Sequence, residues 1–274
     1  AAELNKNIPA NYPLHADAND FLEYAISYSK KNADKISEWH KTTLEWRKEI
    51  DGWKEQWRKE FVEQYSGSET TIKPQYAIRQ ISKLAGDAVV TTGVGQHQMW
   101  TAQYYEFTYP RQLITSGGLG TMGFGLPAAI GAYFADKEKF DDGSKKLVCI
   151  DGDGSFQMNV QELATIAQYN IPIKAFIINN GSLGMVKQWK KIVSHNYYPG
   201  ETDLDRRNPD IVEFSHVYPG INTLRIEDNS ALNSGIKKAL SSKGPYIVDI
   251  WVDKEENVFP MISPGKTLYD LLLK

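Results

Sequence analysis

Two polar segments, each at the end of an apolar run, carry the residues best suited to chemistry. The first is Gly-Asp-Gly-Ser at 152–155, and the second is Asn180, about 27 residues after Asp153. This separation fits one strand-helix-strand crossover, which places the carboxyl ends of two parallel strands at the same edge of a sheet. Asp153 and Asn180 are therefore predicted to share one ion. A carboxylate and an amide oxygen form a hard, incomplete ligand set suited to Mg²⁺, and a diphosphate would supply the missing ligands.

A simpler interpretation of the same residues is open at this point. In an ordinary doubly wound sheet, Gly152 and Gly154 would only form a turn and Asn180 would only cap a strand. The strand, glycine turn, helix and second polar strand end occur in the order that a diphosphate site requires, which favours the site. We expect Ser155 to be the N-cap of a helix at 156–168.

Two further glycine-rich segments have the composition of ligand-binding loops. Gly-Val-Gly-Gln-His at 93–97 follows a predicted strand and opens a predicted helix, so its backbone N–H groups can face a phosphate. His97 would then face that phosphate, or it would cap its own helix. Gly-Gly-Leu-Gly-Thr-Met-Gly at 117–123 lets the backbone approach a flat ring closely, although Met122 could equally be a core thioether.

Met185 and Trp189 are four residues apart in a predicted helix at 182–193, so their side chains share one helical face. We expect this face to point toward the reaction centre at the sheet edge. Packing of Trp189 against the sheet would produce the same spacing, so both interpretations remain open.

The remaining pattern predicts the elements that position these residues. Apolar runs typical of buried strands alternate with helical apolar spacing. The fold class is therefore α/β, a doubly wound open parallel sheet with helices on both faces and ligands at the strand carboxyl ends. The predicted strands are 87–92, 146–151, 173–179 and 246–252, and the predicted helices are 73–84, 121–135, 157–168, 182–193, 209–217 and 231–240.

Residues 1–70 differ from the domain predicted at 71–274. The stretch 17–64 is charged and helical, and its four tryptophans at steps of seven, seven and four lie on one face of a predicted helix. We expect this face to pack as core against a neighbouring domain. An aromatic platform for a base or sugar is the alternative. The segment is a helical linker, and a polar break at 67–71 separates it from the domain. The four tryptophans are Trp39, Trp46, Trp53 and Trp57.

Composition limits the partners. The chain has 274 residues, 41% of them hydrophobic, which supports a sizeable core, and its net charge of −3 with no basic stripe predicts no nucleic-acid partner. The lone cysteine, Cys149, lies in an apolar run and indicates a reducing compartment. The absence of 18 consecutive apolar residues predicts no membrane span, and the first residues lack the pattern of a signal or transit peptide, so we expect the natural start to be missing.

The motifs together resemble a known family. The segments 152–155 and 179–180 resemble the signature by which thiamine-diphosphate enzymes bind the cofactor diphosphate through Mg²⁺. Three more segments, 91–100, 115–131 and 184–189, resemble the acetohydroxyacid (acetolactate) synthase catalytic subunit. The resemblance covers 71–263 well, and the stretch before it is more weakly similar to the end of that family's middle domain.

The resemblance implies roles for individual residues. The metal ligands would be Asp153, Asn180 and the main-chain carbonyl of Ser182, a position at which related synthases often have a charged residue. The Gly120 carbonyl would accept from the 4′-amino group of the cofactor, and Met122 would bend the cofactor. Met185 and Trp189 would shape the acceptor pocket. The implied cofactor-binding residues are Val94, Gly95, Gln96, His97, Gly120, Met122, Asp153, Gly154, Ser155, Asn180, Ser182, Leu183, Gly184 and Met185.

The resemblance also implies the reaction. The whole protein would decarboxylate pyruvate and condense the resulting enamine with a second 2-oxoacid, pyruvate or 2-oxobutyrate, in branched-chain amino-acid biosynthesis. The glutamate that activates the pyrimidine lies on a separate domain of a partner subunit in this family, and nothing in this sequence resembles that domain. The chain alone is therefore expected to be inactive. Two alternatives are another thiamine-diphosphate decarboxylase, oxidase or carboligase, and a non-catalytic nucleotide-binding module.

Further properties follow only from the family. The family implies a homodimer or tetramer, FAD in the whole enzyme and a regulatory small subunit. The enzyme would be cytoplasmic in a bacterium, or in an organelle matrix in a eukaryote.

Overall fold

The chain divides into two compact units, Ala1–Phe61 and Val62–Lys274. The structure, a computed structural model, describes residues 3–6, 8–63, 65, 71–204, 208–263 and 265–273. The polar break predicted at 67–71 lies almost wholly outside the described residues. The assignment of residues 1–70 to the end of a middle domain and a linker stays a prediction.

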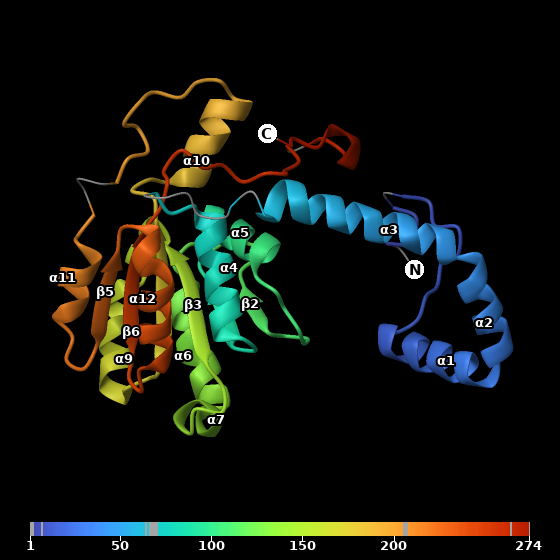
Figure 1. Cartoon of the computed structure of the whole chain (residues 1–274), viewed down its shortest axis with the longest axis horizontal. Helices are drawn as coiled ribbons and strands as arrows, with labels where there is room; N and C mark the ends of the chain where they lie inside the picture. The colour runs from blue at the N-terminus through green and yellow to red at the C-terminus, as the bar shows by residue number, and fades with distance from the viewer. Residues whose placement is uncertain are drawn as a thin grey trace. The chain divides into compact units, whose positions relative to one another are not determined.

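The larger unit is built on a parallel sheet, drawn at the centre of its ribbon in Figure 1. Its described strands follow the order β2-β1-β3-β4-β6-β5, and every neighbouring pair is parallel. Neighbouring strands that run in parallel need crossover connections, and helices supply them here. The strands are β1 (Val89–Thr92), β2 (Leu113–Thr115), β3 (Leu147–Gly152), β4 (Ile173–Asn179), β5 (Asn222–Ile226) and β6 (Tyr246–Trp251).

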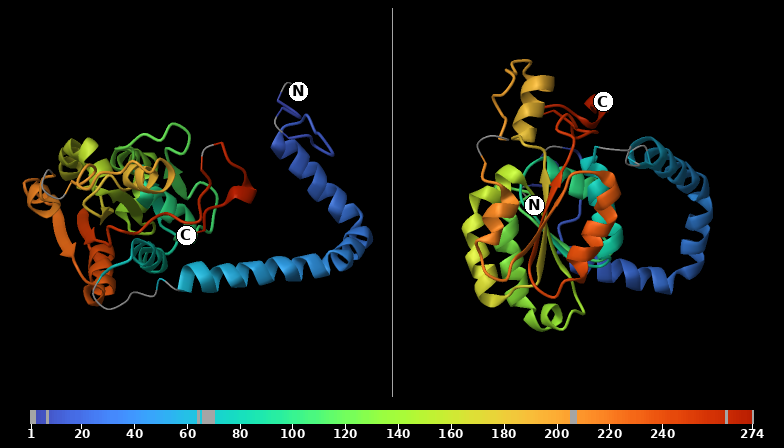
Figure 2. Two further views of the ribbon diagram at one scale, coloured as in Figure 1. Left: turned by 90° about the horizontal axis from the view of Figure 1, so that it is seen from above. Right: turned by 60° about the vertical axis from the view of Figure 1, so that its left-hand side comes forward.

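Helices cover both faces of this sheet, as the right-hand view of Figure 2 shows. One face packs against α4 (Pro74–Ala85), α5 (Gln96–Tyr104) and α12 (Asn229–Ser241). The other face packs against α6 (Gly125–Ala135), α9 (Leu163–Tyr169) and α11 (Ile211–His216), with the short α7 (Lys137–Asp141) after α6. The predicted α/β fold with helices on both faces is thus confirmed.

Alternation along the central strands creates these two cores. On β3, Val148 and Ile150 lie in the core that includes α4, whereas Leu147 and Cys149 lie in the core that includes α6. All six residues of β3 are buried, which explains why its sequence is a continuous apolar run. The sequence did not predict β2 or β5, because both are edge strands, only partly buried and without such a run.

Two predicted helices are interrupted or change type in the structure, and the helix predicted at 121–135 begins only at Gly125. The helix expected at 156–168 is interrupted, because α8 (Asp153–Met158), a 3-10 turn at Val160–Glu162 and α9 replace it. Ser155 is not an N-cap, since α8 already begins at Asp153 and the Ser155 hydroxyl accepts hydrogen bonds from two loops. The helix expected at 182–193 begins as α10 (Gly184–Gln188) and continues as a π-helix at Trp189–Val193.

The smaller unit contains α1 (Ala18–Lys31), α2 (Ala33–Thr42), α3 (Leu44–Trp57) and the first residues of the π-helix at Arg58–Glu63. The tryptophans do not share one helix, because α2 ends before Thr43, whose hydroxyl donates to the Trp39 carbonyl oxygen at 3.0 Å. Such side-chain bonds to the backbone compete with helix continuation. No described residue of α1, α2 or α3 is buried, and Trp39, Trp46 and Trp53 are more than half exposed.

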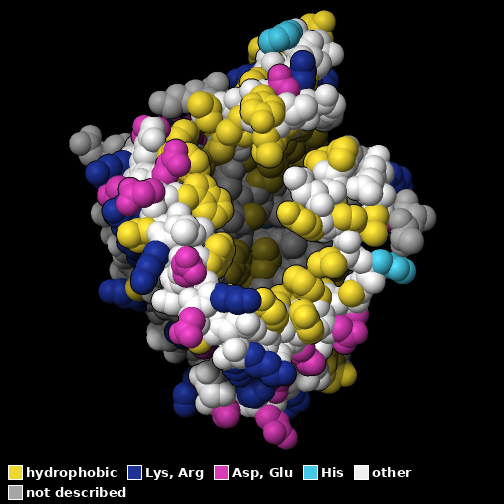
Figure 3. Space-filling model, turned by 90° about the vertical axis from the view of Figure 1, so that its right-hand side faces the viewer, with side chains coloured by type: hydrophobic (Ala, Val, Ile, Leu, Met, Phe, Trp, Pro, Cys, Tyr) yellow, Lys and Arg dark blue, Asp and Glu magenta, His cyan; other side chains and the backbone are white. Residues whose placement is uncertain are grey.

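The helices of the smaller unit expose large hydrophobic side chains, among them Phe21, Leu22 and Trp39. Figure 3 draws hydrophobic side chains at the surface in yellow. Within the described part of this chain, Trp57 is half-buried and stacks on Phe61 of the same unit, with ring centroids 4.5 Å apart. Packing of the tryptophan face against a neighbouring domain stays a prediction. None of the helices in the described part of the chain is both long and apolar enough to cross a membrane.

Two glycines of α6 provide a matched test of close packing. A Cβ on Gly125 would lie 2.5 Å from the backbone nitrogen of Gly93, whereas a Cβ on the exposed Gly131 would meet nothing within 4 Å. We expect Gly125→Ala to lower the free energy of unfolding by about 1–3 kcal/mol. Gly131→Ala should raise it by about 0.5–1 kcal/mol, because alanine is the better helix former. Denaturant unfolding measures both, and equal effects of the two variants would contradict this packing.

Candidate active site

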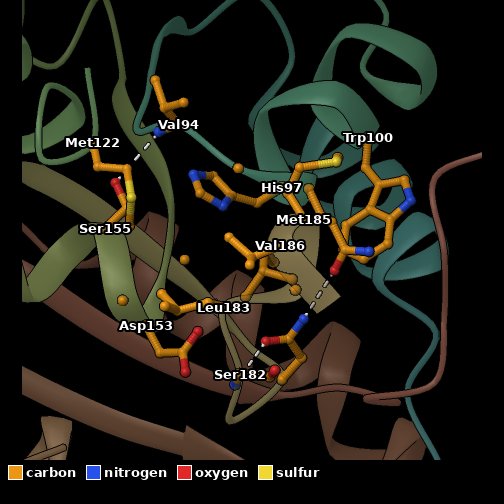
Figure 4. A pocket seen from close by; sticks show the side chains of 17 residues that line it. Val94, His97, Trp100, Met122, Asp153, Ser155, Ser182, Leu183, Met185 and Val186 are labelled. Carbon is orange, nitrogen blue, oxygen red and sulfur yellow. Dashed lines mark hydrogen bonds between the residues drawn. The ribbon is translucent and has the colours of Figure 1, made fainter. Parts of the chain in front are cut away.

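The candidate site lies where the strand order reverses. From β1 the chain passes to β2 on one side and later to β3 on the other, and ligands of open α/β sheets bind at the carboxyl ends of strands beside such a reversal. A cleft with an empty volume of about 450 Å³ lies there, lined mostly by residues at or just after the ends of β1, β3 and β4, with Met122 from the loop before α6 (Figure 4).

Most of the predicted cofactor residues meet in this cleft. Gly120 and Trp189 are the two predicted residues that do not line it, although a Cβ on Gly120 would lie 3.9 Å from Val94 Cγ1. The half-buried Trp189 begins the π-helix that follows α10. The predicted residues that line the cleft are Val94, Gly95, Gln96, His97, Met122, Asp153, Gly154, Ser155, Asn180, Ser182, Leu183, Gly184 and Met185.

The turn after β1 presents the backbone of α5 and the His97 ring to the cleft. Gly95, the N-cap of α5, has φ of +151°, a conformation that residues with side chains rarely adopt. The imidazole of His97 is buried, and its Nε2 has no hydrogen-bond partner among the described residues. It lies 3.4 Å from the Asp151 carboxylate, beyond good hydrogen-bond distance. A Cβ on Gly152 would lie 2.6 Å from His97 Nδ1, so glycine there leaves the room that the ring needs.

Ser155 connects two loops of the site. Its hydroxyl oxygen accepts from the backbone N–H of Gly123 at 3.0 Å and from that of Val94 at 3.3 Å. The glycine turn after β1 and the loop before α6 are thereby held against the start of α8. Figure 4 shows the Ser155 side chain beside Met122 and turned toward Val94.

Asp153 and Asn180 line the same cleft, as their spacing predicts. Asp153 is buried, and its carboxylate lies near Leu183 in Figure 4. The Asn180 side chain donates to Gln96 Oε1 at 3.1 Å and accepts from the Ser182 backbone N–H at 3.1 Å. Gly184 leaves room for the Gln96 and Asn180 amides, since a Cβ there would lie 2.0 Å from Gln96 Oε1 and would displace it.

The donor set is of the hard oxygen type. In the described part of the chain there is no cluster of three or more His, Cys, Asp or Glu side chains that could hold a metal ion. The set predicted here is different, because it combines one carboxylate with an amide oxygen and a main-chain carbonyl. Oxygen donors of this kind suit Mg²⁺, which is held by few protein groups and completed by phosphate and water.

A buried carboxylate on the next strand supports the loop that carries Asn180. Asp249 on β6 is fully buried and accepts from Asn179 Nδ2 at 2.9 Å, while Asn179 Oδ1 accepts from the Gly181 backbone N–H at 3.0 Å. Burial raises the pKa of Asp249, and the hydrogen bonds from Asn179, Trp251 and Arg225 oppose that rise. The only sequence signal for this role is one acidic residue within an otherwise apolar strand.

Sequence reasoning assigned no site role to three residues of the cleft wall, Trp100, Ile178 and Val186, whereas Gly152 belongs to the predicted motif at 152–155. Trp100 lies on α5, one helical turn after Gln96, and is almost fully buried. Its helical spacing from Gln96 was the available signal.

Comparisons with known proteins show the family of the chain. The family described as "Thiamine pyrophosphate enzyme, C-terminal TPP binding domain" matches residues 93–250. The chain is 41% identical over 285 residues to acetolactate synthase 1, chloroplastic, of Zea mays, covering 99% of the chain and 41% of the relative. It is 40% identical over 236 residues to the mitochondrial acetolactate synthase catalytic subunit of Saccharomyces cerevisiae, covering 85% of the chain and 33% of the relative.

A solved structure shows the same fold. The thiamine diphosphate-dependent 4-hydroxybenzoylformate decarboxylase of Rhodococcus jostii RHA1 superimposes with a TM-score of 0.59 at 23% identity, covering 68% of this chain and 33% of that one. The chain spans about two fifths of the length of the maize relative. With 158 of its residues matched by the family, the chain belongs to the thiamine pyrophosphate enzymes and contains their C-terminal cofactor-binding domain.

Proposed function

We propose that the whole protein is a thiamine-diphosphate- and Mg²⁺-dependent acetolactate synthase. It would decarboxylate pyruvate and transfer the two-carbon unit to a second 2-oxoacid, pyruvate or 2-oxobutyrate, in branched-chain amino-acid biosynthesis. The observation that carries this proposal is the convergence of three sequence segments, after β1, β3 and β4, on one cleft in a chain about 40% identical to acetolactate synthases.

The residues of the cleft fit the cofactor and its metal. Asp153 and the Asn180 amide oxygen would bind Mg²⁺ together with the Ser182 carbonyl. His97, whose buried Nε2 has no partner in the described chain, would donate to a phosphate oxygen, and the backbone N–H groups at the start of α5 would face the same group. The bound cofactor supplies the electron sink for decarboxylation.

Other residues would shape the reacting end. The Gly120 carbonyl would accept from the 4′-amino group of the cofactor, and Met122, which lines the cleft, would hold the cofactor bent. Met185 lines the cleft as well, and with Trp189 it would form the acceptor pocket. Such apolar walls discriminate between acceptors by about 1–3 kcal/mol per methylene.

The rest of the enzyme lies outside this chain. A pyrimidine-activating glutamate would come from a domain of a partner subunit, so we propose a homodimer or tetramer and an inactive chain in isolation. FAD, a regulatory small subunit and a middle domain ending in residues 1–70 belong to the same proposal. Two relatives are named as chloroplastic and mitochondrial, which supports an organelle matrix if the source is a eukaryote.

The product of the full-length protein tests the reaction. Incubated with pyruvate, thiamine diphosphate and Mg²⁺, it should form 2-acetolactate, detected by mass spectrometry. Acetaldehyde, acetyl phosphate or another carboligation product in place of acetolactate would assign it to a different thiamine-diphosphate reaction. Preferential binding of ATP or NAD would indicate a nucleotide-binding module.

Asp153→Ala tests the metal site. The variant should lose the Mg²⁺-dependent part of thiamine-diphosphate binding, because the only charged side chain of the proposed ligand set is removed. Isothermal titration of the full-length protein with and without Mg²⁺ measures this. Asp136→Ala, at an exposed position after α6, is the matched control and should bind as the wild type does. Unchanged Mg²⁺ dependence in Asp153→Ala would refute the assignment.

Gly152→Ala tests the position of His97. The added methyl group would lie well inside the contact distance of the imidazole, so the ring must leave its present position. We expect thiamine diphosphate to bind at least about tenfold more weakly, since a preorganised donor of this type contributes roughly 1.5–3 kcal/mol. The exposed Gly131→Ala is the control, and equal affinity of the two variants would count against a phosphate-binding role for His97.

A further inference from the structure

We propose that Gln188 is a positioning residue that sets which atom of the Asn180 amide faces the metal. It would act through Gln96, in a relay of three side-chain amides that begins at the backbone of Val258. The inference rests on the proposed Mg²⁺ site. Gln188 does not itself line the cleft.

The orientation of Asn180 matters because an amide has two ends of nearly the same shape and opposite chemistry. The oxygen is an acceptor that can bind a cation, whereas the NH₂ group is a donor that repels one. A site that uses asparagine as a ligand therefore needs neighbours that favour one of the two orientations.

The first amide of the relay is that of Gln188, whose side chain is buried and 1% exposed. Its Oε1 accepts from the Val258 backbone N–H at 2.8 Å, and its Nε2 donates to the Val258 carbonyl oxygen at 2.9 Å. Backbone groups cannot exchange donor and acceptor roles, so this pair of bonds determines the orientation of the Gln188 amide. The Nε2 also contacts the sulfur of Met261 at 2.9 Å.

The second amide follows from the first. Gln188 Oε1 accepts from Gln96 Nε2 at 2.9 Å, and the same Nε2 lies 3.3 Å from the carbonyl oxygen of Glu256. Both partners are acceptors, so the NH₂ end of Gln96 must face them. Its oxygen is thereby directed toward Asn180.

The third amide is the proposed ligand. Asn180 Nδ2 donates to Gln96 Oε1 at 3.1 Å, and Asn180 Oδ1 accepts from the Ser182 N–H at 3.1 Å. Both bonds are drawn as dashed lines in Figure 4. The NH₂ group is thus occupied by Gln96, and the oxygen, with a second lone pair, is the end left for a cation.

The relay links the metal loop to a distant part of the sequence. Glu256, Val258 and Met261 belong to the segment after β6, about 70 residues beyond Gln188. Residues around a metal ligand that orient it typically change metal affinity by about 10–100-fold when replaced. The same size of effect is expected here.

A double-mutant cycle on the full-length holoenzyme tests the relay. Gln188→Met removes both ends of the amide at similar volume and should raise the Kd for Mg²⁺, titrated calorimetrically at saturating thiamine diphosphate, about tenfold. In Asn180→Asp, both terminal atoms of the side chain are oxygens, so either of them can face the metal and no neighbour is needed to orient the group. In the Asn180→Asp background, Gln188→Met should therefore leave the Kd for Mg²⁺ unchanged or lower it.

Two controls separate orientation from general damage. Gln168→Met, at an exposed position on α9, should bind Mg²⁺ as the wild type does. Gln188→Glu keeps an acceptor for Gln96 Nε2 and for the Val258 N–H, so its Kd should lie closer to that of the wild type than the Kd of Gln188→Met. This variant also carries the test if Gln188→Met does not fold.

The outcomes distinguish this inference from the proposed function. If the wild type shows no Mg²⁺-dependent cofactor binding, the proposed function fails and the relay fails with it. If the wild type binds Mg²⁺ and Gln188→Met binds it equally well, the relay alone is overturned. The relay is also overturned if Gln188→Met weakens Mg²⁺ binding equally in the wild-type and Asn180→Asp backgrounds. The same holds if Gln188→Glu and Gln188→Met weaken Mg²⁺ binding equally. Either result would reflect damage unrelated to the orientation of the Asn180 amide.

Discussion

Parallel pairing of β1, β3 and β4 is the constraint on which the rest of the structure depends. The register aligns Thr92 with Ile150 and Gly152 with Ile178, so the three strands end close together at one edge. Polar residues that are far apart in the chain then meet without any long loop. The two apolar layers that clamp the sheet supply the rigidity that such a site needs, because loops alone would not hold several ligand atoms in register.

Short main-chain contacts complete the site. Ser155 accepts from the backbone of two loops, and Asn179 and Asn180 each accept from a backbone N–H two residues on. Buried polar groups are costly unless they are paired, so each satisfied bond also favours one conformation over its alternatives. The amide relay from Val258 extends the same principle beyond the cleft.

The central features of the fold could be predicted from sequence because their causes are local. The strands β1, β3, β4 and β6 are mostly buried runs, and the separation between Asp153 and Asn180 corresponds to one crossover. The remaining features have tertiary causes. A serine such as Ser155 can cap a helix, but here its hydroxyl accepts a hydrogen bond from the backbone of Gly123, a residue distant in sequence. One predicted helix breaks at Thr43 and another becomes a π-helix at Trp189–Val193, although the apolar spacing in the sequence continues through both positions and gives no sign of either change. Gln188 has the spacing of an ordinary helix residue, and its partners lie far along the chain.

Cys149 lies at the centre of the sheet, on β3 between β1 and β4, and is the only cysteine of the sequence. Burial raises the pKa of its thiol well above the ordinary value, so the folded protein holds it unreactive. A thiol reagent can reach it only when the strands on which the site depends come apart. The rate at which the Cys149 sulfur is alkylated therefore reports how often the sheet opens, and no probe residue has to be introduced by mutation.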